Sequence, residues 1–213
     1  MKRILLYLAL VVVIILIVLT YTGDINLKHL HFTLPNGLNF QQAAPALAAQ
    51  LSQHQVQASS SSSSYVVTGA PTITASFINQ VLSAYHSPAT NTGQSLYDLG
   101  VQYGIDPVFA LAFFLHESTF GKYGMATVTL SLGNMRCMAA YACYHGFAAF
   151  SSWEQGYRAW YQLIRSNYVA RGLQTVAQIV PVYAPSSDNN APVSYIAAIE
   201  HTVSTWRSGR LEV

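Results

Sequence analysis

The sequence predicts a mainly α-helical domain with a small lobe of loops and short strand, preceded by a transmembrane helix and a flexible linker. Three observations predict this organisation. The first 22 of the 213 residues contain a long apolar run, residues 23–70 are rich in Gln, Ala and Ser, and apolar residues in 71–213 recur mainly at helical spacing. The length allows one domain with such appendages.

The charge content of the chain argues against nucleic acid as a binding partner. Only 8% of the residues are charged, against about a quarter in a typical soluble domain. A net charge of +2 is too small to replace the counterions of a nucleic-acid backbone. The seven histidines do not cluster along the sequence, and we interpret His116 as structural rather than as a metal ligand. We therefore expect no nucleic-acid partner and no metal, and any activity must come from few ionisable groups.

Residues 1–22 are expected to form an uncleaved transmembrane signal-anchor. Ile4 to Leu19 are all apolar, and a bilayer-spanning helix needs roughly 17–25 such residues. The small-residue exit of a cleavable signal peptide does not follow the run. Lys2 and Arg3 favour a cytoplasmic amino terminus, which places the rest of the chain outside the cytoplasm. If the segment is cleaved instead, the domain is secreted.

Residues 23–70 are expected to be a low-complexity linker. They carry almost no charge and include six consecutive serines, Ser59 to Ser64. Such a segment buries too little apolar surface to offset the entropy lost on ordering. We therefore place the start of the folded domain at Pro71 and its end at residue 213.

Helices are expected wherever apolar residues recur three or four positions apart. The pattern marks residues 73–85, 96–103, 107–115, 153–164 and 192–206. Asp106-Pro107 is a typical helix start, with Asp as cap and Pro at the first helical position. Ser151 to Glu154 match a capping box. Between residues 121 and 149 the pattern is not helical, and Thr127 to Leu130 are expected to form a short strand.

Glu117 is a carboxylate whose position is explained neither by capping a helix nor by lying on a polar helix face. It follows Phe113 and Phe114 at the carboxyl end of the most apolar helix. Burial there should raise its pKa, and the partial negative charge of the helix end acts in the same direction. A neutral carboxylic acid near pH 7 is what proton donation to a leaving oxygen requires. The alternative is a side chain that reaches solvent and pairs with Lys122.

Three motifs, in the same order along the chain, resemble those of a known enzyme family. The apolar helix ending in Glu117-Ser-Thr-Phe-Gly121 resembles the catalytic helix of lysozyme-like peptidoglycan hydrolases. Leu132 to Arg136 resemble the Asn-containing loop of the family-73 glucosaminidases, usually Asn-Leu-Phe-Gly-Ile-Lys. Tyr183 to Asp188 resemble that family's Tyr-Ala-Thr-Asp segment, ahead of a closing Tyr-Ile helix at Tyr195. The resemblance implies a lysozyme-like α+β fold.

The resemblance also implies roles for individual residues. Glu117 would be the general acid, Tyr183 an active-site tyrosine close to the cleaved bond, and Asn134 a residue of the cleft. Because tyrosine has an apolar body and a polar tip, Tyr123 and Tyr144 are further candidates for lining a sugar-binding groove.

The expected second acid of the family is missing locally, since no Asp or Glu lies between Ser118 and Trp153. An inverting enzyme needs a base about 6.5–9.5 Å from the acid, and a retaining enzyme needs a nucleophile at about 5–5.5 Å. Asp188 could be a remote partner in the substrate site, but its polar setting before Pro192 favours a cap of the last helix. Attack by the substrate's own N-acetyl group or 6-hydroxyl would need one acid only.

Cys137 and Cys143 are candidates for a disulfide, because they lie six positions apart in a domain expected outside the cytoplasm. A cysteine nucleophile paired with His145 is the alternative, and it would make the protein a cysteine amidase or peptidase.

The resemblance favours a hydrolase, and the apolar run at residues 4–19 favours a membrane-tethered one. We expect a monomer that needs no cofactor, because acid-assisted glycoside cleavage requires none. It would cleave β-1,4 glycosidic bonds of the peptidoglycan glycan strand, as an endo-β-N-acetylglucosaminidase does, with Glu117 as its single general acid. A lytic transglycosylase or muramidase on the same fold and a wall-binding module without turnover are the other interpretations.

Overall fold

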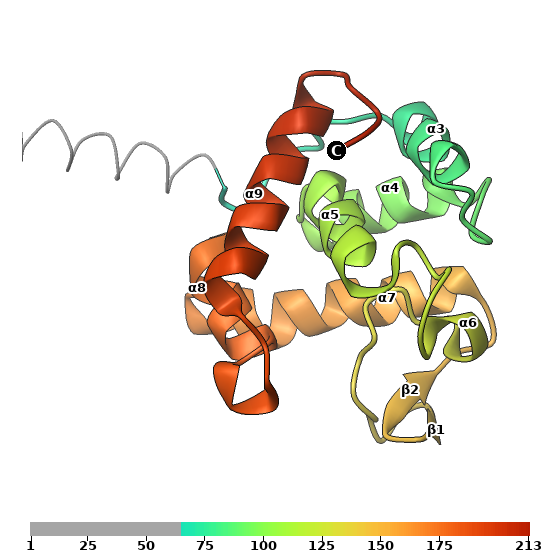
Figure 1. Cartoon of the computed structure of the whole chain (residues 1–213), viewed down its shortest axis with the longest axis vertical. Coiled ribbons are helices and arrows are strands. Elements are labelled where there is room, and N and C mark those ends of the chain that lie inside the picture. The colour runs from blue at the N-terminus through green and yellow to red at the C-terminus, as the bar shows by residue number, and fades with distance from the viewer. Residues whose placement is uncertain (1–64) are drawn as a thin grey trace, which may run out of the picture. The chain divides into compact units, whose positions relative to one another are not determined.

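The computed structural model describes residues 65–213 (Figure 1). The expected transmembrane segment, and the linker as far as residue 64, lie outside the described residues. Between residues 65 and 213, no helix has both the length and the apolar character needed to cross a bilayer.

The described domain is mainly helical and carries one two-stranded antiparallel sheet, which agrees with the expected fold class. The helices are α3 (Ala75–Ala84), α4 (Gly93–Tyr103), α5 (Pro107–Ser118), α6 (Ala126–Thr129), α7 (Trp153–Leu163), α8 (Val176–Tyr183) and α9 (Pro192–Arg207). The strands are β1 (Ala142–Tyr144) and β2 (Phe147–Ala149). Short helical segments are η2 (Ile164–Tyr168, a π-helix) and the 3-10 turns η3 (Val169–Arg171) and η4 (Ser186–Asp188).

Helix α5 lies at the centre of the core, as its continuous apolar sequence predicts. All residues from Pro107 to Phe114 are buried. Helices α4 and α9 pack against α5, α7 packs against α4, and α8 packs against α9 (Figure 1). Helix α5 therefore packs against the helix that precedes it and against the last helix, α9.

Asp106 caps α5 as the sequence predicts, and it also joins three segments of the chain. Its carboxylate accepts hydrogen bonds from Val108 N (3.2 Å), Thr72 N (3.1 Å) and Thr72 Oγ1 (2.6 Å). The same carboxylate forms an ion pair with Arg207 at 3.1 Å. This buried cluster fixes α9 against the start of α5.

The start of α7 differs by one residue from the capping box predicted over Ser151–Glu154. Ser152 is the cap, and its hydroxyl accepts from Gln155 N at 3.3 Å. The Gln155 side chain accepts in turn from Ser151 N at 2.8 Å. Helix α8 was not expected, although Thr175 and Gln178 form a complete capping box at its start.

The folded domain includes the last residues that composition assigned to the linker. Val67 is 2% exposed and donates its backbone N–H to Gln174 O at 2.8 Å, while its carbonyl accepts from Asp106 N at 2.9 Å. Val176 N also donates to Tyr65 O at 3.1 Å. Tyr65 to Val67 are thus hydrogen-bonded to the segment before α8 and to the residue that caps α5, so these residues are part of the described fold.

The strand expected at Thr127–Leu130 is wrong, because this segment is the single-turn helix α6 followed by a left-handed residue. Thr129 donates its hydroxyl to Met125 O at 2.9 Å, and Leu130 has φ 53°. The β-branched residues favour a strand locally, but this turn supplies no strand partner. The strands lie instead on either side of His145 (φ 47°) and Gly146 (φ 87°), a two-residue turn that suits a hairpin.

Candidate active site

A cavity of about 510 Å³ lies where the end of α5 meets the loop lobe, α8 and the segment before α9. Its lining includes four of the residues assigned to catalysis or substrate binding from the sequence: Glu117, Asn134, Tyr183 and Asp188. The other lining residues are Gly133, Met135, Arg136, Cys137, Met138, Phe147, Leu163, Tyr168, Ala184 and Asn190. Segments 70 residues apart thus meet around one carboxyl group.

Glu117 occupies the last turn of α5, and an abrupt reversal of the chain follows it. Thr119 (φ 47°), Phe120 (φ 56°) and Gly121 (φ 82°) are all left-handed. A Cβ on Gly121 would lie 2.8 Å from Trp153 and 2.9 Å from Leu132, so only glycine fits this position. The reversal ends the helix at Ser118, one residue after Glu117.

Ser118 fixes the end of α5 to the loop that forms the opposite wall of the cavity. Its hydroxyl donates to Leu132 O at 2.9 Å and accepts from Gly121 N at 2.9 Å. Asn134, with φ 44°, donates its side-chain amide to the Glu117 backbone carbonyl at 2.7 Å. These two contacts hold the Gly133–Asn134 loop beside the Glu117 side chain, and they explain why Ser follows Glu in the motif.

The Glu117 carboxylate receives a short hydrogen bond from the last helix. Tyr195 donates its hydroxyl to Glu117 Oε1 at 2.6 Å. The Tyr195 ring is 4% exposed and stacks on His116, with ring centroids 3.8 Å apart. Glu117 is therefore held within the domain and does not reach out to Lys122, whose ammonium lies over the Tyr123 ring.

Burial raises the pKa of Glu117 above the ordinary value for a glutamate, because it disfavours the charged form. Hydrogen bonds from Tyr195 and Asn134 favour the charged form and oppose part of this rise. Burial also raises the pKa of Tyr195 and Tyr183 well above their usual value, and the neighbouring Glu117 charge acts in the same direction. Both tyrosines therefore keep their protons as donors at neutral pH.

Tyr183 lines the cavity as expected, although its hydroxyl is directed at the backbone. It donates to Gly133 O at 2.7 Å, and its ring packs edge-on against Phe113 with centroids 5.2 Å apart. Gly133 lies against Trp160, where an added Cβ would be 2.6 Å from the indole. Tyr183 thus links the Asn134 loop to α5, through its hydrogen bond to Gly133 and its ring contact with Phe113.

Tyr168 is a further aromatic residue of the cavity, and the π-helix η2 places it there. Helix α7 continues into η2 over Ile164–Tyr168, and such π-helical turns are common at functional sites. The Tyr168 ring is half-buried, and its centroid lies 6.1 Å from that of Tyr183. Both rings are available along one wall of the cavity.

Asp188 lies in the cavity and does not cap the last helix, so the cap interpretation is wrong. The N-cap of α9 is Ala191, which makes no side-chain capping bond. The Asp188 carboxylate instead lies 3.9 Å from the Arg136 guanidinium. Since η4 and Asn189 (φ 61°) intervene before α9 begins, Asp188 is too far back along the chain to cap it.

Tyr123 and Tyr144 do not line this cavity, and their assignment to the substrate site stays a prediction. Tyr123 is 63% exposed and lies in the turn after the reversal at Gly121. Tyr144 is 47% exposed, on a strand whose three residues all face solvent, and it packs edge-on against His145.

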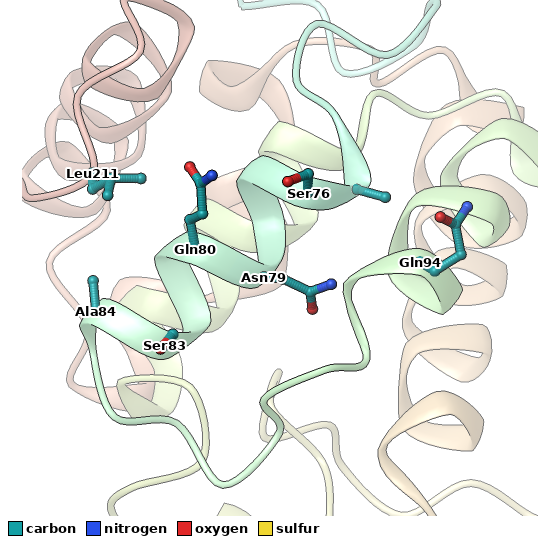
Figure 2. Close-up of a pocket in the computed structure, with 8 residues that line it drawn as sticks. Ser76, Asn79, Gln80, Ser83, Ala84, Gln94 and Leu211 are labelled. Atoms are coloured by element: carbon teal, nitrogen blue, oxygen red, sulfur yellow. The ribbon is translucent and has the colours of Figure 1, made fainter.

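A second hollow, of about 690 Å³, lies along α3 (Figure 2). It is lined by amide, hydroxyl and small apolar side chains, including Asn79, Gln80 and Gln94, with Leu211 at one end (Figure 2). None of its lining residues is ionisable. Acid–base chemistry is therefore possible in the Glu117 cavity and not in this one.

Cys137 and Cys143 form a disulfide that closes the loop leading into β1. Because its sulfur is bonded to Cys137, Cys143 is not a thiolate nucleophile, so the alternative of a cysteine amidase using His145 is wrong. Across residues 65–213, no three His, Cys, Asp or Glu side chains are grouped so that they could hold a metal ion.

Besides Tyr168, two residues of the site, Tyr195 and Arg136, were not selected as site residues from the sequence. Tyr195 lies on the buried face of α9 with Ile199, Val203 and Trp206, and this spacing of four, four and three residues marks it as inward-facing. Arg136 follows Asn134 by two positions and enters the same cavity. No sequence feature distinguishes Arg136 as a site residue, because the sequence does not show which loop residues face the cavity.

The fold is similar to that of solved structures of autolysin E from S. aureus. One of these has a TM-score of 0.51 with 16% sequence identity, covering 70% of this chain and 73% of that chain. A second, in complex with the muropeptide NAM-L-Ala-D-iGlu, has a TM-score of 0.49 and 16% identity, covering 68% and 72%. Neither a protein-family model nor a curated protein matches the sequence. At this identity the likeness shows the fold alone.

Proposed function

We propose that this domain is a peptidoglycan hydrolase that cleaves β-1,4 glycosidic bonds, with Glu117 as the general acid. The observation that carries the proposal is the Glu117 carboxyl itself: it lines an open cavity, burial raises its pKa, and a tyrosine orients it. The fold shared with autolysin E supports the peptidoglycan substrate. The family-73 motifs favour cleavage after N-acetylglucosamine.

The chemistry follows from the protonation state of Glu117. The neutral acid donates its proton to the glycosidic oxygen, which leaves with the electron pair of the broken C–O bond. Tyr195 holds one carboxylate oxygen and leaves the other for the proton. The carboxylate that forms is then stabilised by the Tyr195 hydrogen bond. This step needs no cofactor.

The group that attacks the anomeric carbon is a separate part of the proposal. Asp188 lines the same cavity and is the carboxylate available to activate a water molecule there. Attack by the substrate's N-acetyl group needs no second carboxylate, and attack by the muramyl 6-hydroxyl gives an anhydro product. In each case Asn134, Tyr168 and Tyr183 would contact the sugar rings.

The products released from purified peptidoglycan test this proposal. The full-length chain should release soluble fragments, and borohydride reduction followed by mass spectrometry should show reduced N-acetylglucosamine at the new ends. Reduced muramic ends would identify a muramidase, and anhydro-muramic ends a lytic transglycosylase. Binding to the wall without any soluble fragment would favour a wall-binding module and contradict the enzymatic proposal.

Tyr195→Phe should shift the pH dependence of hydrolysis towards higher pH. The Tyr195 hydrogen bond favours ionised Glu117, so its loss raises the pKa of Glu117 further. The proton needed for catalysis is then retained to higher pH, and the descending limb of the pH–rate profile should move upward. Measured profiles of the parent and Tyr195→Phe test this, with Tyr65→Phe, whose hydroxyl contacts Ser204 outside the cavity, as control. A downward shift would contradict the assigned role of Tyr195.

The location of the domain remains part of the proposal. A signal-anchor at residues 1–22 would hold a monomeric domain outside the cytoplasm, where its disulfide is stable and the peptidoglycan lies.

A further inference from the structure

Arg136 is the one cationic side chain among the residues that line the Glu117 cavity. The other charged lining residues are the carboxylates Glu117 and Asp188. A single guanidinium in a cavity that otherwise carries negative or neutral groups gives the site a place for an anion.

The backbone on both sides of Arg136 is fixed to the β-hairpin. Ala148 N donates to Met135 O at 2.9 Å, and Cys137 N donates to Gly146 O at 3.1 Å. The Arg136 guanidinium lies over the Phe147 ring, 5.3 Å from its centroid. The disulfide of Cys137 starts at the next residue. The guanidinium is thus held at the cavity by the hairpin and the aromatic ring.

The present partner of this guanidinium is weakly held. Asp188 lies 3.9 Å away, and the side chains are 74% exposed for Arg136 and 51% exposed for Asp188. Exposed ion pairs of this kind contribute little to stability, because water screens them. An incoming carboxylate that makes two parallel hydrogen bonds to the guanidinium can therefore replace Asp188.

We propose that Arg136 is a specificity residue that binds a carboxylate carried by the glycan substrate. The inference rests on the proposed function and narrows its substrate class. Glycan strands whose lactyl or peptide substituents carry carboxylates would gain this contact, whereas neutral polymers of N-acetylglucosamine would not. Asp188 is then the internal carboxylate that occupies the Arg136 position in the absence of substrate.

Binding measurements on the full-length Glu117→Gln chain test the inference, because this variant leaves the ligand intact. Isothermal titration calorimetry is carried out with two tetrasaccharides, a peptidoglycan fragment with free peptide carboxylates and neutral tetra-N-acetylchitotetraose. When Arg136→Gln is introduced into the Glu117→Gln chain, the affinity for the peptidoglycan fragment should fall by about tenfold or more. The affinity for the neutral ligand should change by less than about twofold. Arg136→Lys keeps the positive charge but cannot make two parallel hydrogen bonds to a carboxylate. It should therefore give an intermediate loss of affinity for the peptidoglycan fragment.

Two further variants sharpen the result. Asp188→Asn removes the competing carboxylate, so the ratio of affinities for the anionic over the neutral ligand should rise. Arg158→Gln is the matched control, since Arg158 is an exposed arginine of α7 that contacts Gln102 and does not line the cavity. Its affinities for both ligands should equal those of the Glu117→Gln parent.

An equal effect of Arg136→Gln on both ligands, or no effect on either, would overturn the inference while leaving the proposed function in place. If the Glu117→Gln chain with its native Arg136 binds neither tetrasaccharide, the proposed function itself is contradicted and this inference with it.

Discussion

Replacing Glu117 by Gln is expected to lower kcat/KM for peptidoglycan by about 10²–10⁴-fold, the range for loss of a general acid. Gln fills the same volume and still accepts the hydrogen bond from Tyr195, but it has no proton to donate to the leaving oxygen. The substitution therefore removes the proton donor and leaves the shape of the cavity unchanged. The release of soluble glycan fragments, measured as initial rates with both proteins, gives this ratio.

The control for this experiment is Glu200→Gln. Glu200 is a glutamate of α9 whose pKa is also raised by burial, yet it does not line the cavity. It should keep the parent rate. A Glu117→Gln chain that is folded and dissolves peptidoglycan within about threefold of the parent rate would be incompatible with general acid catalysis by this residue.

Asp106→Ala is expected to produce the largest loss of stability, about 3–5 kcal/mol in the free energy of unfolding. Asp106 is 2% exposed. Its carboxylate accepts hydrogen bonds from Thr72 and Val108 and forms an ion pair with Arg207. Its removal leaves the N-terminus of α5 without a cap and takes from Arg207 its carboxylate partner. Urea denaturation of the two proteins measures the difference.

Asp98→Ala provides the comparison for Asp106. Asp98 is an exposed residue of α4 that accepts a hydrogen bond from Gln94, so its loss should change stability by less than about 0.5 kcal/mol. If Asp106→Ala unfolds at the same urea concentration as Asp98→Ala, the buried cluster does not join α9 to α5 in the way described.

The parts of the site that depend on local sequence could be predicted, and Glu117 is the example. A continuous apolar helix, a cap at Asp106 and a Glu before a glycine reversal are all local features, so they place the carboxylate at the end of a buried helix. The same holds for most of the helices, whose apolar spacing is set by the core that they cover.

The parts that depend on contacts between distant segments could not be predicted. Asp188 has the local setting of a cap, and only the folded chain shows that it faces Arg136 instead. Thr127–Thr129 include β-branched residues but have no strand to pair with, and they lie in α6 (Ala126–Thr129) instead. Tyr195 contacts Glu117 across 78 positions, and the spacing along α9 indicates its burial but not its partner.

The protonation of Glu117 is the central claim, and a titration of that side chain tests it most directly. Glutamate carboxyl carbons are labelled with ¹³C in the full-length chain, and the Glu117 signal is identified by its absence in Glu117→Gln. We predict that this signal titrates above the ordinary pKa of a glutamate side chain, because burial raises the pKa of Glu117. A Glu117 signal that titrates at or below the ordinary pKa of a glutamate would contradict the account.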